Sequence, residues 1–138
     1  MVKKASPNSR LALNCLKAFI TGGAICLIGQ FIMNILANRG FSQGDIAAYT
    51  SVILIFAGAV LTGFGIYDNI GKFGGAGSVV PITGFSNSMT AAAMEHRKEG
   101  IVFGTCANMF KIAGPVIVFG MALSMLVGLI YWIISLFV

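Results

Sequence analysis

Most of the groups able to bind a solute lie in one glycine-rich run, residues 73–94. The run predicts a broken helix or a re-entrant hairpin, because an interior Gly costs about 1 kcal/mol relative to Ala and an interior Pro about 3. Inside a membrane, such backbone is tolerated only where protein buries it or where it lines a water-filled cavity. We therefore expect a solute path that includes Gly74, Gly75, Gly77, Ser78, Pro81, Thr83, Gly84, Asn87 and Ser88. A proline-kinked ordinary span packed on its small residues is the alternative.

A lone lysine, Lys111, stands in a long apolar stretch close to Gly114 and Pro115. Ionisable residues inside membrane segments are functional candidates by default, so we expect Lys111 to attract an anionic solute, with Gly114 and Pro115 on the same path. Helix N-termini and free backbone amides at helix breaks also favour anions. The alternative for Lys111 is that its ammonium extends to the membrane interface.

Charge returns in the link at Glu95, Lys98 and Glu99. Glu95 and Glu99 are one helical turn apart, and Lys98 is spaced to pair with Glu95. The simplest interpretation of this link is a solvated helix end.

Enzyme chemistry is not indicated by any motif. The residues after Lys72 lack the Gly-Lys-Ser/Thr ending of a phosphate loop, and Val80 stands where a dinucleotide site needs a small residue. With one histidine, His96, no Ser/His/Asp triad is credible. The three cysteines have no CxxC spacing and are interpreted as small apolar residues. We expect no enzyme activity, no cofactor and no metal site.

The elements that position these residues are membrane helices. Of 138 residues, 57% are hydrophobic and 9% are charged, whereas a soluble domain has about a quarter of its residues charged. Long uncharged stretches reach the roughly 18 to 20 residues that cross a hydrocarbon core of about 30 Å. The sequence predicts an all-α integral membrane protein, with a tail at residues 1–14 and a single membrane domain at 15–138. Within that domain we expect spans at 16–36 and 46–67, the broken segment at 73–94, a short segment at 101–113 and a span at 116–137.

The charge distribution predicts the topology of the chain. Four of the nine basic residues precede or begin the first apolar run, at Lys3, Lys4, Arg10 and Lys17, and the next link is neutral. This pattern favours a cytoplasmic N-terminus. The net charge of +5 does not indicate nucleic-acid binding, because no basic patch with interleaved aromatic residues is present.

Two polar features in the first half have structural interpretations. Gln30 and Asn34 share a face of the first span, and such amides contact another helix or line a wet cavity. Asp45 is placed to complement the N-terminal dipole of the second span.

Several motifs resemble the SpoVAC/SpoVAEB family of spore-former membrane proteins, and the similarity covers nearly the whole chain. The opening residues, Asn14–Phe19 with Gly22-Gly23 and Ile28–Gln30, are similar to the AC branch of that family. Ser86 and His96 depart from the family pattern, in which alanine and an aromatic residue are usual. The matching runs are Gly74–Phe85, Asn87-Ser88, Ala93–Glu95, Lys98–Gly100 and Ala113–Ile117.

The resemblance implies a subunit of the SpoVA complex in the spore inner (forespore) membrane. The cytoplasmic N-terminus predicted from the charge distribution would then lie on the core side of that membrane. It implies a tension-sensitive channel that moves dipicolinic acid with calcium in sporulation and germination. A SpoVAD-like soluble protein and a SpoVAE-like membrane subunit are the implied partners. Glu95 and Glu99 would then supply hard oxygen contacts for the calcium, and Lys98 a gating contact.

The channel hypothesis competes with a scaffold that only anchors the true conduit. We expect the glycines to shape the conduit wall rather than to ease helix packing. Leucine at Gly77 and Gly84 is then expected to give a stable, inserted protein that fails to move the solute.

Overall fold

Every element of the structure is a helix. The computed structural model describes residues 10–137, and no strand is found in that range. This confirms the predicted all-α membrane fold; the first nine residues of the predicted basic tail lie outside the described range. In chain order the elements are α2 (Leu11–Asn38), α3 (Gln43–Gly63), α4 (Ile66–Gly74), α5 (Ala76–Val79), α6 (Ile82–Glu95), the 3-10 helix η1 (Arg97–Glu99), the π-helix η2 (Ile101–Cys106) and α7 (Ala107–Phe137).

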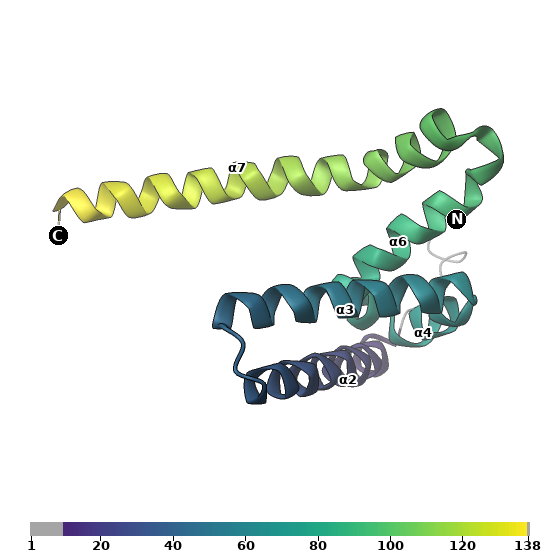
Figure 1. Ribbon diagram of the computed structural model, residues 1–138, viewed down its shortest axis with the longest axis horizontal. Coiled ribbons are helices and arrows are strands. Elements are labelled where there is room, and N and C mark those ends of the chain that lie inside the picture. The colour runs from purple at the N-terminus through teal and green to yellow at the C-terminus, as the bar shows by residue number, and fades with distance from the viewer. Residues whose placement is uncertain (1–9, 138) are drawn as a thin grey trace. The chain divides into compact units, whose positions relative to one another are not determined.

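The first two helices lie side by side and are joined by a short link (Figure 1). Helix α2 begins at Leu11, inside the predicted tail, because Leu-Ala-Leu at 11–13 are strong helix formers. Ser42 caps α3: its hydroxyl accepts the Asp45 N–H at 3.3 Å and donates to the Asp45 carboxylate at 2.7 Å. Asp45 therefore stabilises the start of α3, as predicted.

Helix α3 ends four residues earlier than the predicted span. Gly65 has φ +72°, a left-handed conformation that favours glycine, so the chain turns there and Tyr67 belongs to α4. Helix α4 is amphipathic, with Tyr67 and Gly74 buried on one face. Its other face carries Asp68 and Lys72, which form an exposed ion pair at 2.6 Å.

Residues up to Thr90 form one unit with a small, largely polar core. Helices α4 and α5 both pack on α2, and α4 also packs on α3. The buried side chains of this unit include Ile46, Thr50, Tyr67, Ser78, Thr83 and Ser86. On the outside of α2, the amides of Gln30 and Asn34 are hydrogen-bonded to each other at 3.0 Å, which lowers the cost of placing both in lipid.

The second unit, from Ala91 onward, ends in a single long helix. The predicted break at Gly114-Pro115 is not observed, since α7 continues through Pro115. Proline removes one backbone donor, so the carbonyl of Lys111 loses its helical partner. The helix continues because every other backbone group in lipid must still be bonded within the helix. The predicted short segment at 101–113 is divided between η2 and the start of α7.

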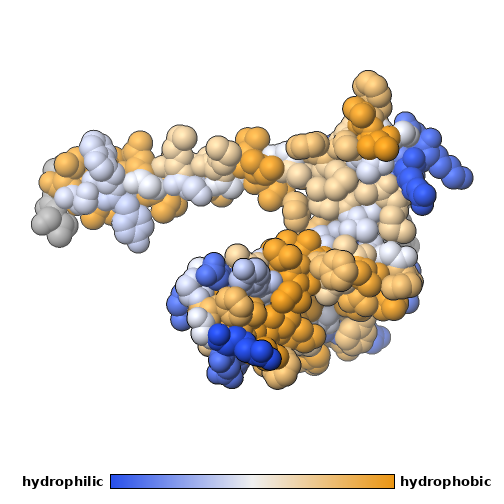
Figure 2. Space-filling model, in the orientation of Figure 1, coloured by the Kyte–Doolittle hydropathy of each residue, from blue (hydrophilic) through white to orange (hydrophobic). Residues whose placement is uncertain are grey.

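Three helices in the described range are long and apolar enough to cross a membrane. They are α2, α3 and the continuous stretch Ile101–Leu136, each of which contains an 18-residue window with a mean hydropathy of 1.8, 2.0 and 2.4, respectively. Apolar side chains accordingly cover much of the visible surface (Figure 2). Helix α6 has 14 residues and extends about 21 Å, which is less than the hydrocarbon core.

Candidate functional site

The predicted break in the glycine-rich run is present. Helix α4 ends at Gly74 because the next residue, Gly75, has a φ of +51° and a ψ of −124°, which lie outside the helical region and favour glycine. One turn of helix follows as α5, and the chain bends again at Val80 and Pro81 before α6 begins. The segment α4–α6, which we call the broken segment, is therefore discontinuous at two points.

Glycines of the broken segment pack directly against α2. A Cβ atom added to Gly77 would overlap with the Ala18 carbonyl group, lying 2.7 Å from its carbon. One added to Gly74 would lie 2.6 Å from the Thr21 side chain. Both distances are too short for real atoms. Glycine at position 77 therefore allows α5 to approach the backbone of α2, and glycine at position 74 allows the end of α4 to approach the Thr21 side chain.

Gly84 is also a packing position. A Cβ atom there would overlap with the carbonyl groups of Ser78 and Val79, in the bend that precedes α6. The expectation that leucine at Gly77 and Gly84 leaves a stable protein is therefore wrong, because both side chains would meet backbone instead of free space. That the broken segment borders a conduit remains a prediction.

A buried tyrosine holds the two bends together. The hydroxyl of Tyr67 donates to the Ser78 carbonyl at 2.8 Å and is hydrogen-bonded to the hydroxyl of Thr83 at 2.9 Å. Ser78 is fully buried, and its own hydroxyl donates to the Gly75 carbonyl at 2.9 Å. These bonds satisfy polar groups that the breaks remove from the regular helical pattern.

Two further side chains fasten α6 to α3. Ser86 donates to the Ile55 carbonyl at 2.7 Å, and the Asn87 amide is hydrogen-bonded to Thr62 at 2.8 Å. Ser88 instead donates to the Gly84 carbonyl of its own helix at 3.0 Å. The position Ser86, where the family resemblance suggests alanine, thus carries an inter-helix bond.

The broken segment reaches the middle of a membrane helix. Ile55 is twelve residues after Gln43, the start of α3, which places it about 18 Å along a helix of about 32 Å. A Cβ atom on Gly58, one turn further, would lie 3.0 Å from the Thr83 carbonyl. The start of α6 therefore lies beside the centre of α3, at the depth where irregular backbone needs protein or water beside it.

The bend itself is not covered by the other described residues of the first unit. Val79 and Val80 are 64% and 83% exposed, although both are apolar. Ser78, immediately before them, is fully buried. One side of the bend is thus packed against the rest of the first unit, and the other side is exposed.

The remaining predicted site residues lie in the second unit. Lys111 is exposed on α7, one turn before Pro115. The expected pairing of Lys98 with Glu95 is not formed, since Lys72 with Asp68 is the one ion pair among residues 10–137. The physical reason is that α6 ends at Glu95, so the helical spacing between the two side chains is lost. No group of three or more His, Cys, Asp or Glu side chains comes together in the described range.

The sequence did not reveal which residues contact the glycines and polar side chains of the broken segment and fix its position. The predicted span 46–67 ends at Tyr67. However, Tyr67, Ile70 and Gly74 recur at helical spacing on one face of residues 66–74. The charged residues Asp68 and Lys72 lie on another face, a pattern typical of a short amphipathic helix. Thr62, Ala18 and Thr21 carried no comparable signal, because small residues in an apolar helix are ordinary.

Comparisons with known proteins agree with one another. The family model described as SpoVAC/SpoVAEB sporulation membrane protein matches residues 14–130. The chain is 50% identical over 130 residues to Stage V sporulation protein AC of Bacillus subtilis (strain 168), covering 94% of this chain and 87% of that protein. No solved structure matches this chain.

Proposed function

Because the chain belongs to the SpoVAC/SpoVAEB family of sporulation membrane proteins, we propose that it is a channel subunit of the SpoVA complex. In this proposal, dipicolinic acid with calcium crosses the spore inner membrane through the channel in sporulation and germination, and membrane tension opens it. A SpoVAD-like soluble protein and a SpoVAE-like membrane subunit complete the assembly. The family is one of membrane proteins rather than of enzymes.

The observation that carries this proposal is the outward-facing bend beside the centre of α3. Backbone that leaves a helix at this depth is not exposed to lipid, so the exposed side of Val79–Pro81 faces water or another protein chain. A water-filled path along that side is the arrangement a channel needs, and dipicolinate, a planar dianion, is attracted there by backbone amides.

Reconstitution of the purified protein into liposomes tests the proposal. A channel is expected to release entrapped dipicolinate, detected by terbium fluorescence, and to pass current when the membrane is stretched. Release that requires added partner subunits supports a channel subunit if a polar side chain at Val80 changes its rate, and a scaffold if it does not. No release and no current, alone or with the partners, would contradict it.

A specific observation favours a second candidate, a scaffold that anchors the true conduit. Gly77 and Gly84 pack against backbone of their own unit, and Gly74 against the Thr21 side chain, instead of lining free space. A scaffold is expected to bind the partner subunits and retain them in the membrane while giving no dipicolinate release in liposomes.

The short length of α6 predicts a re-entrant broken segment, with the charged link on the same side as the N-terminus. Cysteine at His96, in a background with Cys15, Cys26 and Cys106 replaced, is expected to resist an impermeant thiol reagent added to intact cells. Gln43→Cys in the same background is the control, because the link before α3 lies outside in this topology. Labelling at both positions would show that the segment spans the membrane.

Replacing Lys111 with glutamine is expected to slow dipicolinate release while the protein still inserts. One lost charge contact of about 1 kcal/mol corresponds to a roughly fivefold lower rate. The measurement is terbium-detected release from liposomes, with Arg39→Gln, in the link between α2 and α3, as the charge-matched control. An unchanged rate would remove Lys111 from the proposed path and leave it as a lysine that extends to the interface.

A further inference from the structure

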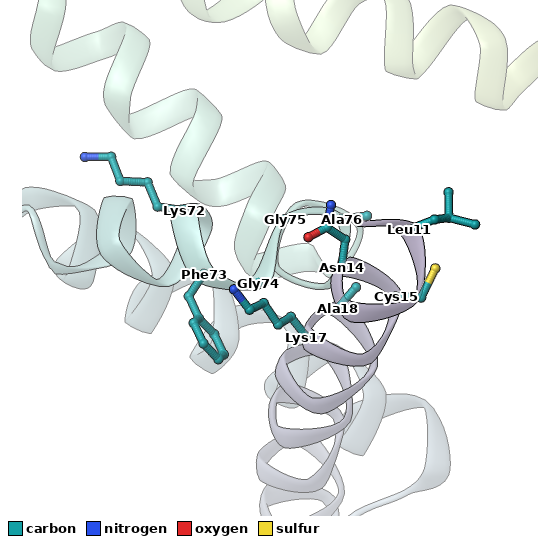
Figure 3. Close-up of a pocket in the computed structure, with 10 residues that line it drawn as sticks. All are labelled: Leu11, Asn14, Cys15, Lys17, Ala18, Lys72, Phe73, Gly74, Gly75 and Ala76. Carbon is teal, nitrogen blue, oxygen red and sulfur yellow. The ribbon is translucent and has the colours of Figure 1, made fainter. Parts of the chain in front are cut away.

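A pocket of about 430 Å³ lies between the start of α2 and the junction of α4 with α5 (Figure 3). Its lining combines polar groups, Asn14 and Lys17, with the apolar side chains of Leu11, Phe73 and Ala76. Gly75, the first break of the broken segment, also lines it. We call it the α2–α4 pocket.

The charge in this pocket comes from Lys17. Its side chain is half-buried, and its ammonium lies 5.1 Å from the centre of the Phe73 ring, a cation–π contact that holds it at the pocket wall. Lys72 also lines the pocket, but its ammonium points away in Figure 3 and is paired with Asp68. Within residues 10–137, no carboxylate lies within ion-pair distance of Lys17. The pocket therefore presents one uncompensated positive charge.

The position of the pocket along α2 corresponds to the edge of a membrane. Lys17 is six residues after Leu11, about 9 Å into a helix whose N-cap is the basic residue Arg10. Helix α4, which forms the other wall, is amphipathic and has the charged Asp68–Lys72 face expected of a helix lying at the interface. Phospholipid headgroups occupy this depth.

We propose that the α2–α4 pocket binds the phosphate of an anionic phospholipid. Lys17 pairs with the phosphate, the Asn14 amide donates a hydrogen bond to it, and Ala18 and Phe73 contact the glycerol and the first acyl carbons. A ligand that is charged at one end and apolar at the other matches the lining better than a free anion, which leaves the apolar wall unused. Because Gly75 and Ala76 belong to the broken segment, the bound lipid would contact its first bend directly. This proposal does not depend on the transported solute.

The native Cys15 provides the test, because it lines the pocket and is exposed. With Cys26 and Cys106 replaced by serine, the full-length protein is placed in phosphatidylcholine vesicles with or without phosphatidylglycerol, and the rate of alkylation by N-ethylmaleimide is measured. Phosphatidylglycerol is expected to slow alkylation of Cys15. Lys17→Gln is expected to raise the phosphatidylglycerol concentration needed for half-protection about fivefold, since one lysine near an anionic lipid contributes about 1 kcal/mol.

Two control variants and two vesicle conditions complete the test. Lys17→Arg, which keeps the charge, is expected to retain protection, and Arg39→Gln at the far end of α2 is expected to behave as the parent protein. The proposal would be overturned if Cys15 were alkylated at the same rate with and without phosphatidylglycerol. It would also be overturned if phosphatidylglycerol protected Cys15 equally well in the Lys17→Gln variant. Protection by inorganic phosphate or dipicolinate in phosphatidylcholine vesicles, as strong as that by phosphatidylglycerol, would also overturn it and identify a site for free anions.

Discussion

Replacing Gly77 with alanine is expected to separate α5 from α2 and to destabilise the protein by about 2 to 3 kcal/mol. The added methyl group would overlap with the carbonyl group of Ala18, and backbone cannot move aside as the end of a flexible side chain does. The measurement is the free energy of unfolding in detergent micelles, combined with the dipicolinate content of spores that carry the variant, detected by terbium fluorescence after heat lysis.

Gly71→Ala is the matched control for this substitution. Gly71 lies in the interior of α4, and nothing is found within 4 Å of an added Cβ. Its replacement is expected to be neutral or to stabilise the helix by up to about 1 kcal/mol. If the two variants were equally stable, the contact between α5 and α2 would be shown to be unimportant, and the glycines of the broken segment would again be candidates for lining free space.

Leucine at both Gly77 and Gly84 is expected to lower the free energy of unfolding further than Gly77→Ala does. Loss of dipicolinate from such spores would therefore report a misfolded segment and would not identify a blocked path. Smaller changes on the outward face are better probes of a conduit. Val80, which is 83% exposed and contributes little to the fold of its own chain, is the position where a polar or charged side chain tests the path with the least structural disturbance.

Removing the Tyr67 hydroxyl is expected to release the two bends from each other. Tyr67→Phe leaves the carbonyl of Ser78 and the hydroxyl of Thr83 without their partner inside the unit, at a cost of about 1 to 3 kcal/mol. The ring remains, so lost packing does not contribute. We expect a lower free energy of unfolding, together with altered release of dipicolinate from liposomes, because the bend beside α3 is no longer held in place.

Tyr49→Phe provides the control for Tyr67→Phe. Tyr49 lies on α3, about half exposed, and its ring contacts Phe41 edge to face at 5.4 Å, a contact that phenylalanine keeps. Its stability and release rate are expected to be those of the parent protein. A similar loss in both variants would show that the Tyr67 hydrogen bonds have no special role in holding the broken segment.

The membrane helices and the broken segment can be predicted from local composition. Long uncharged stretches predict membrane helices because each backbone group in lipid must be bonded within its own helix, and the composition of residues 73–94 predicts a break because glycine and proline disfavour continuous helix. Pro115 shows the limit of that reasoning. The same residue type that ends a helix elsewhere is accommodated inside α7, since the loss of one hydrogen bond is smaller than the cost of unwinding apolar helix in lipid.

The amino-acid sequence was sufficient to establish the membrane class, the family and the presence of a broken segment, because these depend on composition and on short motifs. The role of each residue in that segment depends on partners distant along the chain, which composition does not reveal. Gly77 meets Ala18, fifty-nine residues earlier, and Ser86 meets Ile55, thirty-one residues earlier. Only when α5 is packed on α2 and α6 on α3 does Gly77, which looks suited to a conduit wall, become a point of backbone contact. The same packing makes Tyr67, an ordinary tyrosine near the start of α4, the group that joins both bends.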